Sequence, residues 1–265
     1  MIKDPASRGV ALITSRGCPF QCIFCASSVM WKRKVRFHSV AYVTRQVRQV
    51  MDLGIRYFFF CDDTLLVDRR RTKELLAEFK RLGIVWRCSS TTHMMTPELA
   101  QAMYDAGCRQ VDFGIESGSD RMLRIMKKAS RRAEHEAGVR AAKEAGLMVK
   151  AMLMVGLPGE SEEDVRETVR FVRENDADMY ALTVFVPLPG CDVADHLDRY
   201  AYPLDTSIPY EQYFIVGADK KTPIVHQEKD KIERWRSMIW EAIGQRATLD
   251  IIYQREQRQL QCEAV

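Results

Sequence analysis

The sequence predicts an α/β protein built around a parallel sheet, and three features of its residue pattern support that fold class. Short apolar runs alternate with amphipathic segments through about six units between residues 10 and 190. Runs that are apolar at almost every position are typical of parallel strands covered by helices. Glycine follows most of the amphipathic segments, as expected where helices end. The periodicity alone leaves open whether the sheet curls into a barrel or stays open and doubly wound.

Six apolar segments are predicted to be strands, and five amphipathic segments are predicted to be the helices between them. The strands are residues 10–14, 57–61, 84–88, 110–115, 148–155 and 181–186. The helices are residues 39–53, 70–82, 97–106, 133–145 and a segment that begins at residue 161. Thr96 is predicted to cap the third helix ahead of Pro97, and Ser161 with Asp164 forms a capping-box pattern.

The pattern weakens after the sixth strand. Residues 190–228 contain three prolines and are expected to be irregular, whereas residues 229–257 are predicted to form a final helix with an apolar stripe. We therefore expect a core domain over residues 1–190. A C-terminal extension over residues 191–265 would consist of an irregular segment and a helix.

Composition and charge exclude several classes of protein. The chain has 265 residues, of which 46% are hydrophobic, and a formal net charge of +4. It contains no apolar run of membrane-spanning length, and its first residues lack the apolar core of a signal peptide. We expect a cytoplasmic protein with no membrane partner. Basic clusters at residues 32–36, 69–71 and 127–132 are interpreted as solvated surface, so a nucleic-acid partner is not expected.

Three of the eight cysteines lie close together, since Cys18, Cys22 and Cys25 all follow the first predicted strand. Thiolates are soft ligands that favour zinc, copper(I) or iron–sulfur clusters. A structural zinc site normally needs four ligands, usually in two pairs, and the sequence has no second pair. The other cysteines at positions 61, 88 and 108 lie in apolar stretches and are interpreted as buried small hydrophobic residues.

A loop with three cysteines suits a 4Fe–4S cluster in which one iron lacks a protein ligand, so that this iron can bind a substrate or cofactor. Two alternatives stay open at this point. One is a zinc site completed by Cys61 or a histidine, and the other is a set of thiols that bind no metal.

The cysteine spacing of three and then two intervening residues, with an aromatic residue just before the third cysteine, is the motif of the radical S-adenosylmethionine (SAM) superfamily. From about residue 10 to residue 190 the chain resembles that superfamily, and most of all its cobalamin-dependent and methylthiotransferase-like branch. Five further segments at predicted strand ends support the resemblance. They are residues 14–19, 60–63, 114–118, 156–160 and 187–190.

The resemblance implies a partial (β/α)6 TIM-like barrel, with the cluster at the end where the loops after the strands converge. It implies a 4Fe–4S cluster held by Cys18, Cys22 and Cys25, and SAM bound at the open iron. In the family, reduction of SAM yields a 5′-deoxyadenosyl radical that abstracts hydrogen from the substrate. The expected partners are a reductant such as flavodoxin or ferredoxin and a small-molecule or peptide substrate.

The resemblance also assigns residues to the SAM site, position by position. Phe24 is expected to lie near the adenine, with a core position as its structural alternative. Asp62 and Asp63 are expected to accept a hydrogen bond from the methionine ammonium, with a helix cap as the alternative. Glu116, together with Ser117, is expected to reach the ribose or the methionine part of SAM.

Two turns and two departures from the family pattern complete the list of candidates. Gly156 and Pro187 begin turns in which the backbone is expected to approach the cofactor, although both could be simple turns. Where many relatives have an Asp after the third strand, this chain has His93, which becomes a candidate for proton transfer or substrate contact. Cys191 stands where relatives usually have Thr, and is a candidate hydrogen-atom donor with core packing as its alternative.

Three hypotheses for the reaction follow. The first is a radical SAM enzyme that acts on an unidentified small molecule or peptide. The second is the catalytic core of a cobalamin-dependent methyltransferase, with cobalamin as a third cofactor held by a partner domain or subunit. No cobalamin-binding domain is expected ahead of the core, since the core begins about ten residues into the sequence. The third is a non-catalytic iron–sulfur or zinc protein.

Overall fold

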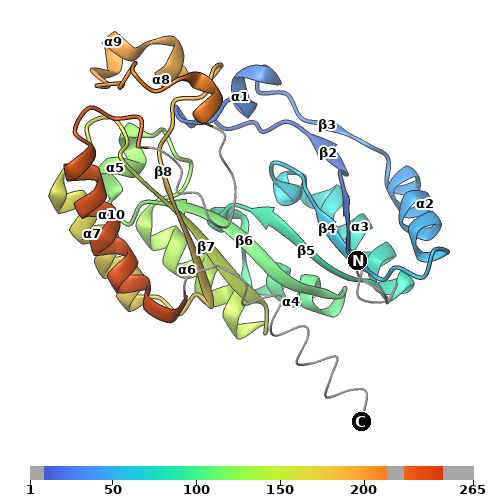
Figure 1. Ribbon diagram of the computed structural model, residues 1–265. Helices are drawn as coiled ribbons and strands as arrows, with labels where there is room; N and C mark the ends of the chain where they lie inside the picture. The colour runs from blue at the N-terminus through green and yellow to red at the C-terminus, as the bar shows by residue number, and fades with distance from the viewer. Residues whose placement is uncertain (1–8, 214–223, 247–265) are drawn as a thin grey trace.

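The computed structural model describes residues 9–213 and 224–246, and its centre is a six-stranded parallel sheet (Figure 1). The strands lie in the order β1-β4-β5-β6-β7-β8, and every neighbouring pair is parallel. Their bounds are β1 Gly9–Leu12, β4 Tyr57–Phe60, β5 Val85–Ser90, β6 Cys108–Glu116, β7 Met148–Val155 and β8 Met179–Val184. The predicted α/β class with six strands is confirmed.

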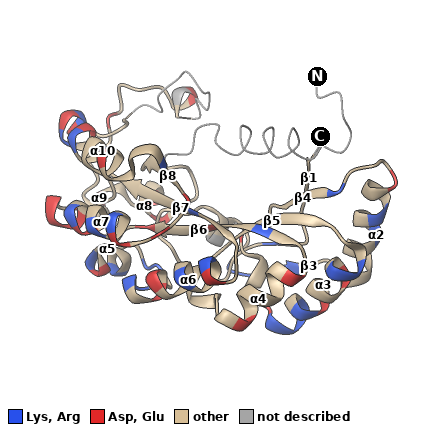
Figure 2. Cartoon of the chain, turned by 90° about the horizontal axis from the view of Figure 1, so that it is seen from below, with Lys and Arg blue, Asp and Glu red and all other residues tan. Residues whose placement is uncertain are grey.

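The helices between the strands cover one face of the sheet. They are α2 Val40–Met51, α3 Arg69–Leu82, α4 Pro97–Asp105, α6 Arg132–Glu144 and α7 Glu162–Glu174. Figure 2 shows α2, α3, α4 and α6 on the same side of the sheet. Strands that follow one another in chain order, with helices on one side only, form a (β/α) barrel wall rather than a doubly wound sheet. Because β1 and β8 do not pair in the described part of the chain, the barrel is partial.

The core lies between the sheet and these helices. Phe60 stacks on Phe79 with ring centroids 4.7 Å apart, and Trp86 meets the edge of Phe60 at 5.7 Å. The indole of Trp86 donates a hydrogen bond to the carbonyl of Ala106 at 2.7 Å. Along β5 and β7, buried side chains alternate with partly exposed ones. The sheet therefore has a second face, opposite these helices and only partly buried, which we call the inner face.

Several short elements were not predicted. The strands β2 Ser15–Arg16 and β3 Arg36–Phe37 form a small antiparallel ribbon, and the helices α1 Ser27–Met30 and α5 Asp120–Ile125 flank the site described below. The segment expected to be irregular contains two helical turns, α8 Asp192–Asp195 and α9 Leu197–Tyr200. Elements of two to six residues are too short to show a hydrophobic period.

The C-terminal extension joins the main core rather than standing apart from it. Helix α10 (Lys229–Ile243) packs against α7 and β8, and its apolar stripe belongs to the same core as the sheet. The predicted helix continued to residue 257, but residues 247–257 lie outside the described residues. The domain boundary at residue 190 stays a prediction. Within the described ranges, no helix is long and apolar enough to cross a membrane.

Candidate active site at the carboxyl end of the sheet

The three clustered cysteines lie in the loop between β2 and α1, and Ile23 fixes the middle of that loop. The Ile23 amide donates to the carbonyl of Met126 at 3.0 Å, and the Ile23 carbonyl accepts from the amide of Val193 at 3.2 Å. Its side chain is fully buried in a small apolar cluster under the loop. Chain segments that follow β6 and β8 thus hold the cysteine loop from both sides.

Two aspartates that follow β4 fasten the ends of the loop. Asp62 is buried and accepts hydrogen bonds from the backbone amides and hydroxyls of Thr14 and Ser15. Asp63 accepts from the amide of Gly17 at 2.9 Å and from the hydroxyl of Ser27 at 2.8 Å, just before Cys18 and just after Cys25. Both carboxylates therefore hold the loop in place. Their predicted contact with an ammonium group stays a prediction.

Burial acts on the thiols of this loop. It raises the pKa of Cys18, and it raises the pKa of Cys22 to about 11, although the positive charge of Lys128 opposes both shifts. A thiol must lose its proton to ligate a metal. A buried cation beside the loop lowers the cost of three thiolates in one place.

An ion pair of Glu116 and Lys128 lies beside the cysteines. The Lys128 ammonium is 3.1 Å from Glu116 Oε1, and both side chains are almost completely buried. Burial lowers the pKa of Lys128, but Glu116 and the thiol of Cys22 more than offset this, so the pKa is raised. Lys128 also lies 5.9 Å from the centre of the Phe24 ring. It is therefore a charged lysine enclosed within the site.

The backbone of β6 is shaped around this pair. The register between β6 and β7 shifts between Gly114 and Glu116, and Glu116 has a φ of 66°, a left-handed conformation that non-glycine residues rarely adopt. A Cβ at Gly114 would lie 2.5 Å from Glu116 Oε1 and 2.9 Å from the Lys128 ammonium. A side chain at position 114 would therefore displace the ion pair from its present position.

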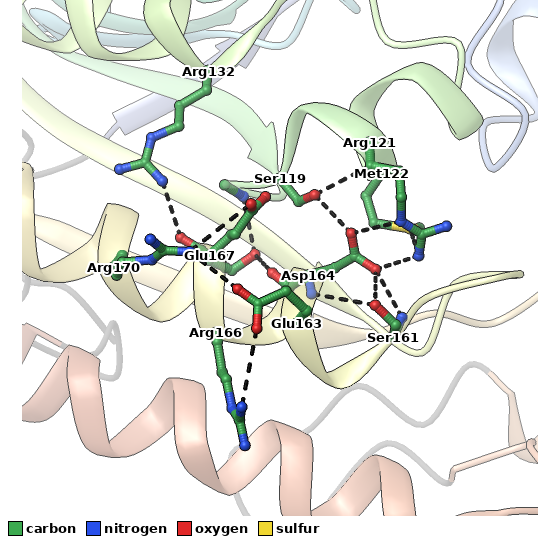
Figure 3. Close-up of polar contacts among 12 residues, drawn as sticks. Ser119, Arg121, Met122, Arg132, Ser161, Glu163, Asp164, Arg166, Glu167 and Arg170 are labelled. Atoms are coloured by element: carbon green, nitrogen blue, oxygen red, sulfur yellow. Dashed lines mark hydrogen bonds and ion pairs between the residues drawn. The ribbon is translucent and has the colours of Figure 1, made fainter.

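Helix α7 holds the turn that follows Glu116. Ser117 is buried and its hydroxyl lies 3.2 Å from that of Thr168. Figure 3 shows how Asp164 accepts from the Ser119 hydroxyl at 2.7 Å and from Arg121. Burial alone would raise the pKa of Asp164, but its hydrogen bonds hold that pKa near about 2. In this arrangement Ser117 contacts α7, and its predicted contact with SAM stays a prediction.

Two histidines lie beside the end of β5. His93 belongs to the short 3₁₀ helix Thr92–Met94, its Nδ1 lies 2.9 Å from the hydroxyl of Ser130, and burial lowers its pKa. Its ring also meets the edge of Phe20, with centroids 5.2 Å apart, in the cysteine loop. The structure thus places His93 against that loop. Behind it, His135 is fully buried with Nδ1 2.7 Å from the Thr92 hydroxyl, and burial lowers its pKa to about 3.

The two predicted turns follow strands β7 and β8. Gly156 has a φ of 88° and donates its amide to the buried Glu160 at 2.6 Å, and burial raises the pKa of Glu160 to about 8. Pro187 is buried, and the turn it begins ends at Gly190, which lies beside Ala26 of the cysteine loop. Cys191 is fully buried and its sulfur accepts from the amide of Ala194 at 3.3 Å, so it caps α8.

The residues present fit an iron–sulfur cluster with a bound zwitterion. Three partly buried sulfur donors, a buried ammonium and a buried carboxylate meet in one place. Among the described residues, no group of His, Cys, Asp and Glu side chains converges on one point as the ligands of a single ion do. The three thiolates of a cubane cluster bind three different irons, so they need not converge.

Two interpretations of the sequence were wrong. Lys128 was assigned to a solvated basic run, but it is enclosed in the site. The composition of that run gave no signal, because only the fold turns this lysine inward. Cys61 was expected to be buried, but it is exposed at the end of β4. Cys88 and Cys108 are fully buried as expected.

Comparison with known proteins decides the family. The sequence pattern of the radical SAM superfamily matches residues 12–172, which is more than half of the chain. The chain belongs to the radical SAM superfamily. Members use a 4Fe–4S cluster and SAM, so the predicted superfamily, enzyme class and these two cofactors are confirmed at the level of the family.

Curated relatives of this radical SAM chain are considerably longer than it is. An uncharacterized methyltransferase of Pyrococcus horikoshii is 35% identical over 182 residues, covering 68% of this chain and 40% of the relative. Cytidylyl-2-hydroxyethylphosphonate methyltransferase of Streptomyces wedmorensis is 30% identical over 206 residues, covering 74% of this chain and 39% of the relative. The chain thus spans about two fifths of these relatives.

Solved structures support the barrel fold. The radical SAM methyltransferase TsrM of Kitasatospora setae, solved with cobalamin and a 4Fe–4S cluster bound, superposes with a TM-score of 0.71 at 16% identity and covers 91% of this chain and 54% of TsrM. Coproporphyrinogen III oxidase of Escherichia coli, also a radical SAM enzyme, superposes with a TM-score of 0.61 at 13% identity. The superposition covers 91% of this chain and 54% of the oxidase chain. At these identities the likeness shows the fold.

Proposed function

We propose that the chain binds a 4Fe–4S cluster through Cys18, Cys22 and Cys25 and cleaves SAM reductively to start radical chemistry on a small molecule or peptide. The observation that supports this best is the loop itself, which brings three sulfur ligands to the carboxyl end of the sheet beside a buried cation. When bound, the cluster and SAM supply a 5′-deoxyadenosyl radical that abstracts a hydrogen atom.

Glu116 and Lys128 are the groups that we assign to the methionine part of SAM. An amino-acid zwitterion carries an ammonium and a carboxylate, and this ion pair offers the complementary carboxylate and ammonium at 3.1 Å from one another. Enclosed charges strengthen such contacts because little water competes for them. Phe24, within 6 Å of the same lysine, is assigned to the adenine. Gly156 and Pro187 are assigned to the backbone that borders the cofactor.

The two aspartates and Ser117 are assigned to positioning the segments that carry the proposed ligand contacts. Asp62 and Asp63 already accept hydrogen bonds from the ends of the cysteine loop, so we assign them to positioning that loop. Ser117 positions the turn after Glu116 through Thr168. A carboxylate oxygen can accept more than one hydrogen bond, so a further contact from these aspartates to the ammonium is compatible with this role.

His93 and Cys191 are the candidates for chemistry on the substrate. Burial keeps the pKa of His93 below its ordinary value, so at neutral pH the ring is uncharged and can accept a proton. Cys191 is fully buried as a helix cap, so its thiol reaches a substrate only after α8 moves. We therefore favour His93 over Cys191.

A second candidate function is methyl transfer in the manner of a cobalamin-dependent radical SAM enzyme. Two curated relatives are named methyltransferases, and TsrM, with a similar fold, was solved with cobalamin. A partner domain or subunit would then hold the cobalamin. Spectral titration of the reconstituted chain with hydroxocobalamin separates the two candidates, since only the second predicts binding or a requirement for a corrinoid partner. The reductant, flavodoxin or ferredoxin, and the cytoplasmic location remain part of the proposal.

The experiment that tests the proposal is anaerobic reconstitution followed by assay with dithionite. We expect about four irons and four sulfides per chain, and 5′-deoxyadenosine from SAM. Cys25→Ala is expected to lose cluster and product, whereas Cys61→Ser, which alters an exposed cysteine outside the loop, keeps both. A protein that binds one zinc ion, or a loaded protein that leaves SAM intact, would contradict the proposal.

A further inference from the structure

Arg87 occupies an unusual place on the inner face of the sheet. Its neighbours in β5, Trp86 and Cys88, are fully buried on the helix side, so Arg87 points to the opposite face. In the sheet register Arg87 lies between Phe59 of β4 and Gln110 of β6. It is therefore near the centre of the wall that a partial barrel offers to a substrate.

The guanidinium of Arg87 stacks on an aromatic ring but has no acceptor among the described residues. Its central carbon lies 4.2 Å from the centre of the Phe59 ring. Its Nε is buried and makes no hydrogen bond, and Arg87 forms no ion pair within the described part of the chain. A buried donor without a partner is rare in folded proteins, because it has lost its hydrogen bonds to water and gained none in return.

Two other partly or fully buried arginines also stack on aromatic rings, but both have hydrogen-bond acceptors. Arg71 stacks on Phe37 and donates to the carbonyls of Thr14 and His38. Arg246 stacks on Tyr180 and donates to several backbone carbonyls. Only Arg87 of these three lacks an acceptor among the described residues.

The nearby carboxylates form no ion pair with Arg87 among the described residues. Asp62 is occupied by Thr14 and Ser15, as described above. Asp112, on the neighbouring strand, accepts from the side-chain amide of Gln110 at 2.6 Å and makes no ion pair with Arg87. Lys150 lies opposite Asp112 in the register of strands β6 and β7. It adds a second cation that forms no ion pair in the described ranges. Two cations near this face, Arg87 and Lys150, thus lack an ion-pair partner within the described ranges.

We propose that Arg87 and Phe59 form a substrate subsite that binds an oxyanion, a carboxylate or a phosphate, on the inner face of the sheet. The planar guanidinium offers parallel N–H groups that match either oxyanion, and the ring beneath it fixes its orientation. The subsite rests on the proposed function, because it defines the class of substrate that the radical would attack. Its substrates carry an anionic group that anchors them away from the reacting carbon.

Cys61 provides a reporter for this subsite that does not depend on SAM cleavage. Its thiol is exposed at the end of β4, two residues beyond Phe59, where burial raises its pKa and the charge of Arg87 lowers it. Iodoacetate and iodoacetamide both alkylate a thiolate with loss of iodide, but only iodoacetate is an anion. In the reconstituted full chain, the rate of each reagent at Cys61 is followed by peptide mass spectrometry.

We expect the ratio of the iodoacetate rate to the iodoacetamide rate at Cys61 to fall about fivefold in Arg87→Gln. Arg87→Lys, which keeps the charge, is expected to retain part of the ratio. Arg109→Gln is the matched control, since Arg109 also stacks on a ring, at 4.4 Å from Tyr104, but donates to carbonyls and lies outside the inner face. That control is expected to leave the ratio unchanged.

Competition then identifies the oxyanion. Inorganic phosphate and acetate are compared with chloride at constant ionic strength, and saturable protection of Cys61 from iodoacetate by one of them names the preferred group. An unchanged ratio in Arg87→Gln, or protection by neither anion beyond that of chloride, would overturn the subsite. Failure of the proposed function would show separately, as missing 5′-deoxyadenosine in a protein whose Cys61 still reports Arg87.

Discussion

At the carboxyl end of the sheet, Lys128 and Glu116 form an ion pair whose side chains are 7% and 11% exposed, whereas Arg166 and Glu162 on α7 form one whose side chains are 60% and 54% exposed. The outer pair joins residues one helical turn apart and is surrounded by water. The inner pair joins segments on either side of a strained turn. Solvated pairs contribute little to stability, while enclosed charges are expensive to hold and strongly coupled. The two regions are therefore expected to respond very differently to the loss of one charge.

The largest expected effect comes from breaking the inner pair. Lys128→Met leaves the Glu116 carboxylate enclosed without its cation, and we expect the free energy of unfolding to fall by about 3–5 kcal/mol. Urea unfolding of the cluster-free chain measures this. The double variant Lys128→Met with Glu116→Gln should recover most of the loss, because no charge is then left unpaired. A single variant as stable as the wild type would show that the pair is effectively solvated.

The buried Glu160 predicts that the free energy of unfolding depends on pH. Burial raises the pKa of Glu160 from 4.5 to about 8, so between these values the folded chain binds a proton that the unfolded chain has lost. Raising the pH through this window therefore lowers the free energy of unfolding, by about 2 kcal/mol between pH 6 and pH 8. Urea midpoints across this range measure the slope.

The Glu160→Gln variant keeps an acceptor for the Gly156 amide without a titrating group, so its profile should lose this slope. Glu163→Gln, on the exposed side of α7, should keep the wild-type profile. If Glu160→Gln retained the slope, another group would be its source.

The Asp63→Ala variant tests whether hydrogen bonds at the two ends of the cysteine loop help the chain to retain iron. Removing its carboxylate in Asp63→Ala frees the amide of Gly17 and the hydroxyl of Ser27 on either side of the cysteines. We expect iron to be lost to a chelator about tenfold faster, which corresponds to about 1.4 kcal/mol. Asp68→Ala is the matched control, because Asp68 caps α3 through the Arg71 amide and touches no part of the loop. Equal rates of iron loss in the two variants would argue against a positioning role.

The smallest effect is expected on the outer helices. Arg166→Ala removes the exposed pair with Glu162, and the free energy of unfolding should change by no more than about 0.5 kcal/mol. The same urea experiments measure it. A loss comparable to that of Lys128→Met would mean that solvent exposure does not determine how much each ion pair contributes to stability.

Much of the fold could be read from local pattern. The caps at Thr96 and Ser161 are where they were predicted, since Thr96 accepts from the Leu99 amide and Ser161 from the Asp164 amide. The six strands and the helix beginning at Lys229 were also predicted, with shifts of a few residues. These features depend on periodicity and on residues three or four positions apart. Helix α5, with six residues, offered no period to read.

The candidate site was predictable only in part. The cysteine spacing and the resemblance that it supports are properties of one short segment. What Asp62 and Asp63 hold, and where Lys128 points, depend on segments that are far apart in sequence. Lys128 belongs to a run of basic residues in which Lys127 and Arg131 are exposed and Arg132 is partly buried, and no local pattern distinguishes it from them.

The sequence by itself determined the order of strands and helices, the loop of three cysteines and the superfamily to which the chain belongs, because these are set by contacts between near neighbours and by motif spacing. The tertiary structure decided which charges are enclosed, which carboxylates fasten the loop and that Arg87 finds no acceptor among the described residues. Burial and hydrogen-bond partners depend on the packing of distant segments. The energy and the pKa of a charged group change when water is removed from around it.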